Sequence, residues 1–183
     1  MTRSVSAKVA ADLRRPRIGV SQCLLGDPVR YDGGHRRSEC VADLLARRCD
    51  LVPVCPEVEL GLGVPRETIQ LVRLGERVHL MGTGTGIDHT DAMEQYAQRR
   101  VRELVQLGLS GFVFKRDSPS CGVSTVRVLD PHGTVTTNGR GLFAVALLQA
   151  LPHLPITEED ALFGPGACDD FLARVALYQR RQS

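Results

Sequence analysis

Three cysteines in this sequence follow short apolar runs that predict buried strands. Cys23 follows residues 18–21, Cys55 follows residues 51–54, and Cys121 comes shortly after residues 112–114. We expect the three thiols to meet at the carboxyl edge of one sheet, where the ligand sites of open α/β sheets lie. Three thiolates can bind zinc or an iron–sulfur cluster, and a set of three leaves one coordination position open for chemistry. The alternative is that each is a small apolar core residue, as buried cysteines often are.

The other cysteines, Cys40, Cys49 and Cys168, are expected in the core or at the surface, with Cys40 and Cys49 outside the site and Cys168 the one that could confuse the count of ligands. No pair has the Cys-x-x-Cys spacing of a zinc ribbon, so the fold must assemble any metal site from distant loops. The first 16 residues are polar and basic and lack the apolar stretch of a secretory signal. We therefore expect a reducing, cytoplasmic setting that disfavours disulfides.

Polar side chains beside these cysteines are candidates for catalysis. Glu57, two residues after Cys55, can act as a general acid or base, and the alternative is an ordinary solvated carboxylate. Ser118 and Ser120 come just before Cys121, and either hydroxyl can orient a substrate or act as a nucleophile. Ser-Pro sequences also suit turns, so a purely structural role is the alternative for both serines.

Other motifs carry weaker signals. Lys115 and Arg116 can neutralise a negative cluster or bind an anionic group, or simply form salt bridges at the end of their strand. The Gly-Thr-Gly-Thr-Gly segment at residues 82–86 lacks the Lys-Ser/Thr of a phosphate-binding loop, and we interpret it as a flexible connection. Of the five histidines, only His35 lies close to a candidate motif.

The composition is that of a globular protein, with 183 residues, 43% hydrophobic residues and a formal net charge of +2. This length fits a single domain, which we place at residues 17–183, after a partly disordered segment at residues 1–16. The small net charge does not indicate RNA or another nucleic acid as a partner. No apolar stretch approaches the roughly 18 residues of a membrane span, so no membrane association is expected.

Strands and helices are expected to alternate, which predicts the α/β class with a mostly parallel sheet flanked by helices. Residues 91–107 have helical apolar spacing and are followed by Gly108, while residues 69–74 and 77–81 predict a hairpin. The other expected elements are helices at 38–48, 142–151 and 169–182, a strand at 123–128 and a short strand from Ile156.

Several motifs occur here in the order in which a small bacterial family carries them. They are Ser-Gln-Cys-Leu-Leu-Gly at 21–26, Val-Arg-Tyr-Asp-Gly at 29–33, Val-Pro-Val-Cys-Pro-Glu at 52–57, Lys-Arg-Asp-Ser-Pro-Ser-Cys-Gly at 115–122 and Gly-Arg-Gly-Leu-Phe-Ala at 139–144. Over about residues 17–151, the chain resembles the thiouracil desulfidases, a family once listed as a domain of unknown function.

The resemblance implies a Rossmann-like α/β fold and a [4Fe-4S] cluster whose three ligands match Cys23, Cys55 and Cys121. It also implies a catalytic glutamate, matched by Glu57, and a catalytic serine, for which we favour Ser118 and keep Ser120 open. Residues 157–183, which include Cys168, form a helical extension beyond the compact family core.

The expected substrate is a small-molecule thiolated pyrimidine such as 2-thiouracil, whose C=S becomes C=O. The resemblance implies that sulfide would be released at the open iron of the cluster, which suits soft sulfur and would act as a Lewis acid, with no external electron donor. One alternative is a zinc-dependent or cysteine-nucleophile hydrolase, although no histidine lies near the three cysteines to serve as a base. Another is a non-catalytic metal-binding module, although structural zinc normally takes four protein ligands.

Overall fold

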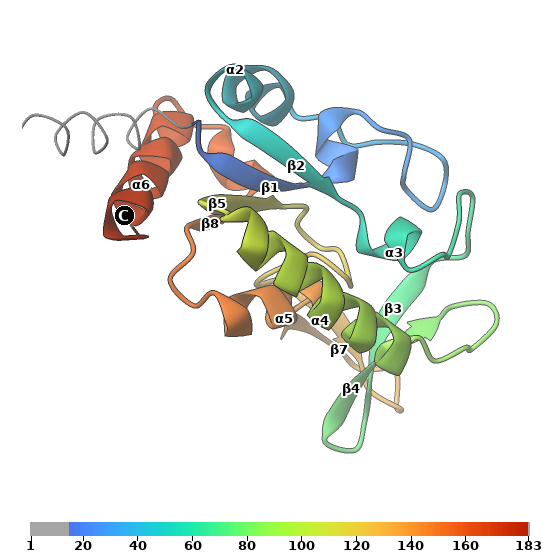
Figure 1. Cartoon of the computed structure of the whole chain (residues 1–183). Helices are drawn as coiled ribbons and strands as arrows, with labels where there is room; N and C mark the ends of the chain where they lie inside the picture. Colours follow the sequence, from blue (N-terminus) through green and yellow to red (C-terminus); the bar gives the residue numbers. More distant parts are fainter. Residues whose placement is uncertain (1–14, 183) are drawn as a thin grey trace, which may run out of the picture.

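The computed structural model describes residues 15–182 (Figure 1). The segment predicted to be partly disordered, residues 1–16, therefore lies outside the described residues except for its last two. The described strands form two four-stranded sheets, one parallel and one mixed. Within the described part of the chain, no helix is both long and apolar enough to cross a membrane.

The parallel sheet positions the candidate site. Its strands, in spatial order, are β2 (Asp50–Val54), β1 (Arg17–Ser21), β5 (Gly111–Phe114) and β8 (Ile156–Glu158), and every pair in it is parallel. All four carboxyl ends therefore lie at one edge. Pro53 is tolerated because β2 is an edge strand and needs no backbone donor on its outer side. The α/β class and the parallel sheet flanked by helices are confirmed.

Side chains alternate between the two faces of this sheet. Phe112 and Phe114 lie in one apolar core, together with α4 (Thr90–Leu107) and α5 (Leu142–Ala150). Val113, between them, lies in a second core with α6 (Ala167–Gln182) and the helical segment of residues 40–48. That segment is a π-helical turn, Cys40–Leu45, continued by α2 (Ala46–Arg48). Helices thus cover both faces of the parallel sheet (Figure 1).

The sequence did not reveal the second sheet, whose order is β4-β3-β6-β7. Its hairpin, β3 (Ile69–Leu74) and β4 (Arg77–Gly82), is the predicted one. β6 (Val126–Leu129) pairs in parallel with β3, and β7 (Val135–Gly139) pairs antiparallel to β6. Pairing between β3 and β6 is long-range, so no local pattern indicates it. This sheet packs its buried side chains into the core that contains α4 and α5.

The glycine-rich segment at residues 82–86 connects β4 to α4. The Glu67 carboxylate accepts hydrogen bonds from the backbone amides of Gly84 (2.7 Å) and Thr85 (3.0 Å). In a phosphate-binding loop, such amides would face the phosphate. Here the Glu67 side chain binds them instead. Gly108, with φ of +70°, ends α4 as expected.

One expectation about the cysteines is wrong, because Cys40 and Cys168 form a disulfide. The two residues are 128 positions apart, and the sequence alone does not show that the π-helical turn and the start of α6 pack on the same face of the sheet. Cys49 is buried in that core with a free thiol, as expected for a core residue.

The C-terminal segment is part of the parallel sheet. β8 adds a strand beside β5, and a 3-10 helix, η3 (Glu159–Leu162), follows it directly. Glu159 is buried and accepts hydrogen bonds from the Lys115 ammonium and the Arg116 amide, while Asp160 pairs with the Arg116 guanidinium at 2.6 Å. These contacts fix the two basic residues at the end of β5.

Gly141 allows the loop that carries Cys121 to pack against the start of α5. A Cβ at this position would overlap the backbone of Ser120 and Cys121. We therefore expect Gly141→Ala to lower the free energy of unfolding by about 1–3 kcal/mol, as overpacking does. Gly164→Ala is the matched control, because a Cβ there has its nearest neighbour at 4.0 Å. Denaturant unfolding of both variants is the measurement, and equal stabilities would contradict this packing.

Candidate active site at the carboxyl edge of the parallel sheet

A cavity of about 550 Å³ opens at the carboxyl edge of the parallel sheet, and Cys23, Cys55 and Cys121 all line it. Cys23 lies in the 3-10 turn η1 (Gln22–Leu25) directly after β1, and Cys55 precedes α3 (Pro56–Glu59), directly after β2. Cys121 lies in the loop that leads from β5 to the second sheet. The structure thus brings together three thiols that are far apart in the sequence, and all three are free.

The loop that carries Cys121 is shaped by Ser118 and by α5. The Ser118 hydroxyl accepts hydrogen bonds from the amides of Ser120 (3.3 Å) and Cys121 (3.1 Å), which is the turn chemistry expected of Ser-Pro. The first amides of α5 donate to the carbonyls of Pro119 and Ser120, so the loop satisfies amides that a helix start leaves unpaired. Ser118 itself lines the cavity.

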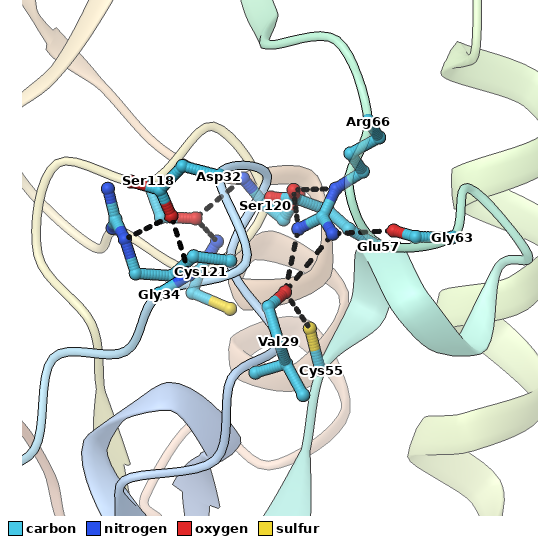
Figure 2. Close-up of polar contacts among 11 residues, drawn as sticks. Val29, Asp32, Gly34, Cys55, Glu57, Gly63, Arg66, Ser118, Ser120 and Cys121 are labelled. Atoms are coloured by element: carbon cyan, nitrogen blue, oxygen red, sulfur yellow. Dashed lines mark hydrogen bonds and ion pairs between the residues drawn. The ribbon is translucent and has the colours of Figure 1, made fainter.

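Ser120 lies deeper than Ser118. It is fully buried and donates a hydrogen bond from its hydroxyl to Glu57 Oε1 at 3.0 Å. Glu57 lines the cavity and its side chain keeps 15% exposure. The sequence did not distinguish the two serines, but the structure gives them different positions. Ser118 lines the cavity, whereas Ser120 contacts the Glu57 carboxyl group (Figure 2).

Arg66 holds the second oxygen of Glu57. Its Nε and Nη2 atoms lie 3.0 and 2.6 Å from Glu57 Oε2, and its side chain is only 6% exposed. Three donors therefore point at the Glu57 carboxyl group, two from Arg66 and one from Ser120. Both oxygens of Glu57 are thus held, and the carboxyl group has one fixed orientation at the cavity wall.

Arg66 is the functional residue that the sequence analysis missed. It follows Val64 and Pro65 in a loop with no regular pattern, and no local signal distinguishes it from a surface arginine. Only the fold shows that its guanidinium is buried against Glu57. His35, singled out in the sequence, is exposed and is not among the residues that line the cavity.

Glu59 supports Cys55 from the side away from the cavity. Its carboxylate accepts a hydrogen bond from the Cys55 amide (3.0 Å) and another from the Tyr96 hydroxyl (2.9 Å). Arg100, on α4, pairs with the same carboxylate at 3.0 Å. Cys55 is therefore anchored through its backbone, which leaves its thiol free to face the cavity.

Burial keeps the three thiols protonated while no cation binds them. It raises the pKa of Cys23 to about 11, with a further rise from the neighbouring Cys55. Burial is also the main cause that raises the pKa of Cys55, and it raises the pKa of the buried Cys121 well above 9.0. A metal centre that binds these sulfurs must therefore displace their protons.

The donor set fits an iron–sulfur cluster. Within residues 15–182, no three His, Cys, Asp or Glu side chains stand close enough to share one metal ion. A cluster takes each thiolate on a different iron atom, so its donors stand further apart than donors that share one ion. Three free thiols line one cavity, and thiolates are the ligands that hold iron–sulfur clusters.

The cavity is also rich in positive charge, which a thiolate-bound cluster would partly offset. The basic residues that line it come from several loops and strands, namely Arg30, Arg36, Arg66, Lys115, Arg116 and Arg127. Two carboxylates, Glu57 and Asp117, line it with them. The lining therefore favours an occupant that carries negative charge.

The fold and the site are those of an α/β protein with a three-thiol pocket at the carboxyl edge of its parallel sheet. The sequence matches the family model of 2-thiouracil desulfurase over residues 18–159. The chain therefore belongs to the 2-thiouracil desulfurase family, which confirms the resemblance drawn from its motifs. The match extends to β8 and Glu159, beyond the core of 17–151 expected from the motifs.

Two individual proteins are similar to the chain. The uncharacterized protein YbbK of Bacillus subtilis (strain 168) is 33% identical over 139 residues, which cover 73% of this chain and 90% of YbbK. The solved structure of the [4Fe-4S]-dependent thiouracil desulfidase TudS is 31% identical, with a TM-score of 0.65. That similarity covers 88% of this chain and 99% of TudS.

The raised pKa of Cys23 predicts slow alkylation of the metal-free protein. A pKa of about 11 in place of 9.0 leaves about a hundredth of the thiolate at pH 8, and the thiolate is the reactive form. Alkylation of Cys23 by iodoacetamide, followed by peptide mass spectrometry, should therefore be about a hundredfold slower than in the urea-unfolded chain. Its rate should keep rising up to about pH 11. A folded chain that reacts at the unfolded rate at pH 8 would contradict the burial of this thiol.

Proposed function

We propose that this protein is a thiouracil desulfidase that uses a [4Fe-4S] cluster held by Cys23, Cys55 and Cys121. The observation that carries the proposal is the convergence of three free thiols on one cavity beside the Glu57 carboxylate. The net reaction takes a thiolated pyrimidine and water to the corresponding pyrimidine, with C=O in place of C=S, and hydrogen sulfide. Atoms balance without an oxidant or a reductant.

The protein's own residues supply binding and proton transfer. Cys23, Cys55 and Cys121 would hold such a cluster, which would supply one iron for the soft sulfur of the thione and Lewis-acid polarisation of its carbon–sulfur bond. Glu57, which lines the cavity, takes a proton from the water that attacks the ring carbon. The same carboxyl group can then return a proton to the departing sulfur.

The two serines have different roles in this proposal. Ser118 lines the cavity and contacts the substrate, because its hydroxyl proton remains free while its oxygen accepts two backbone amides. Ser120 is fully buried, so it does not reach a substrate in the cavity and instead orients Glu57 through Oε1. Ser118, the serine that the sequence favoured, is therefore the one that contacts the substrate. Ser120 is the serine that acts on Glu57.

The alternatives fit the geometry less well. A cysteine nucleophile requires a thiolate and an adjacent base, whereas these thiols have raised pKa values and no histidine is among the residues that line the cavity. A binding module with a structural metal would not need a carboxyl group that is held by an arginine and a serine at the cavity wall.

Cluster binding and catalysis should separate in single variants. Changing Cys23, Cys55 or Cys121 to Ala removes a ligand and should lose both bound iron and turnover. Glu57→Gln keeps every proposed ligand, so it should retain iron and acid-labile sulfide while turnover of 2-thiouracil falls by about a hundredfold or more, the scale of a lost general acid/base. The measurement is iron, sulfide and turnover on anaerobically prepared protein.

Cys49→Ala is the control for this series. It removes a buried thiol from the core beneath α6 rather than from the cavity, so it should keep both iron and turnover. Near-normal turnover in Glu57→Gln would remove Glu57 from the mechanism. Loss of iron in that variant would make Glu57 a support for the cluster.

A further inference from the structure

We propose that Arg66 is the positioning residue of this site and holds the Glu57 carboxylate in its orientation at the cavity wall. This inference rests on the proposed function, in which Glu57 transfers protons. Arg66 donates two hydrogen bonds to Oε2, at 3.0 and 2.6 Å, whereas Oε1 receives one hydrogen bond, from Ser120 at 3.0 Å. Arg66 therefore holds Oε2 while Ser120 holds Oε1, and the carboxylate is fixed in one orientation.

The guanidinium cannot turn away from this position without losing several bonds. Its Nη1 atom donates to the carbonyls of Val29 (3.1 Å) and Gly63 (2.8 Å), and Nη2 donates to Val29 as well (3.1 Å). Its backbone amide donates to the carbonyl of Tyr31 at 2.9 Å. Figure 2 shows the Arg66 guanidinium with its contacts to Glu57, Val29 and Gly63.

All five N–H donors of the guanidinium are engaged, two by Glu57, two by Val29 and one by Gly63. No donor remains for a substrate, even though Arg66 lines the cavity. Arg66 therefore acts through Glu57 and does not contact the reacting atoms. That distinction makes it a positioning residue.

Lysine cannot replace this arrangement. It carries three donors on a compact ammonium group, whereas the site uses a planar fork that reaches a carboxylate and two carbonyls in three directions. The Val29 carbonyl also lies 3.9 Å from the sulfur of Cys55. Arg66 thus fixes the position of a carbonyl beside a proposed cluster ligand as well as the orientation of Glu57.

The test is a double-mutant cycle on the anaerobically prepared, cluster-loaded protein. Arg66→Ala and Arg66→Lys should each lower kcat for 2-thiouracil by about thirtyfold or more, with KM changed less than about threefold, because a group that only orients the base acts on the chemical step. In the Glu57→Gln background, the same changes should lower kcat by less than about threefold, because the carboxylate through which Arg66 acts is gone. Added methylguanidinium should restore part of kcat in Arg66→Ala only where Glu57 is present.

Arg100→Ala is the matched control, since Arg100 also pairs with a glutamate at 3.0 Å but does not line the cavity. Its effect on kcat should be the same in the unaltered protein and in the Glu57→Gln background. If Arg66→Ala lowers kcat by equal factors in both backgrounds, the proposal is wrong. Loss of iron in both Arg66→Ala and Arg66→Lys would also overturn it, because Arg66 would then support the cluster loops instead.

A structural measurement separates this inference from the proposed function. In a crystal structure of Arg66→Ala, Glu57 Oε1 should no longer lie within hydrogen-bond distance of Ser120. A carboxylate that keeps its place would refute the positioning role whatever the substrate. If the carboxylate moves but the unaltered protein does not convert 2-thiouracil, then the proposed function fails and the positioning role of Arg66 stands.

Discussion

The buried ion pair between Glu57 and Arg66 is the interaction on which the arrangement of the site depends. Arg66 binds the carbonyls of Val29 and Tyr31 in the segment that follows Cys23, and it binds Glu57 in the segment that follows Cys55. Glu57 in turn accepts a hydrogen bond from Ser120 in the loop of Cys121. Breaking such a pair by removing one partner costs about 3–5 kcal/mol, because the other charge is left buried and unpaired. The same contact therefore orients the proposed base at the cavity wall.

The rest of the fold supplies rigid positions for these loops. Parallel pairing of β1 with β2 and β5 brings the three strand ends to one edge, and helices on both faces bury the sheet. The start of α5 fixes the loop of Cys121 through its first amides, and Gly141 allows the close approach that this requires. On the other side, β8 and η3 hold Lys115 and Arg116 through Glu159 and Asp160, so the C-terminal segment takes part in shaping the cavity.

The sequence was sufficient to predict features that depend on local patterns. Strand ends, the hairpin, the long helix and the cysteine motifs all follow from short-range periodicity and residue type, and Cys23, Cys55, Cys121 and Glu57 were named on that basis. Features that depend on packing between distant segments were not predictable. The disulfide between Cys40 and Cys168, the pairing of β3 with β6 and the burial of Arg66 all join such segments. The different places of Ser118 and Ser120 depend on the path of one loop, which a turn-forming sequence does not determine.

The central claim is that three cysteines hold a cluster with one iron left for the substrate. Mössbauer spectroscopy of the ⁵⁷Fe-reconstituted, anaerobic protein tests this most directly, because it distinguishes iron atoms by their ligands. We predict a [4Fe-4S] spectrum in which one iron differs from three thiolate-bound ones, and in which only that component shifts when 2-thiouracil is added. Four equivalent irons that do not respond to 2-thiouracil, or a protein that binds zinc and no iron under the same conditions, would contradict the account.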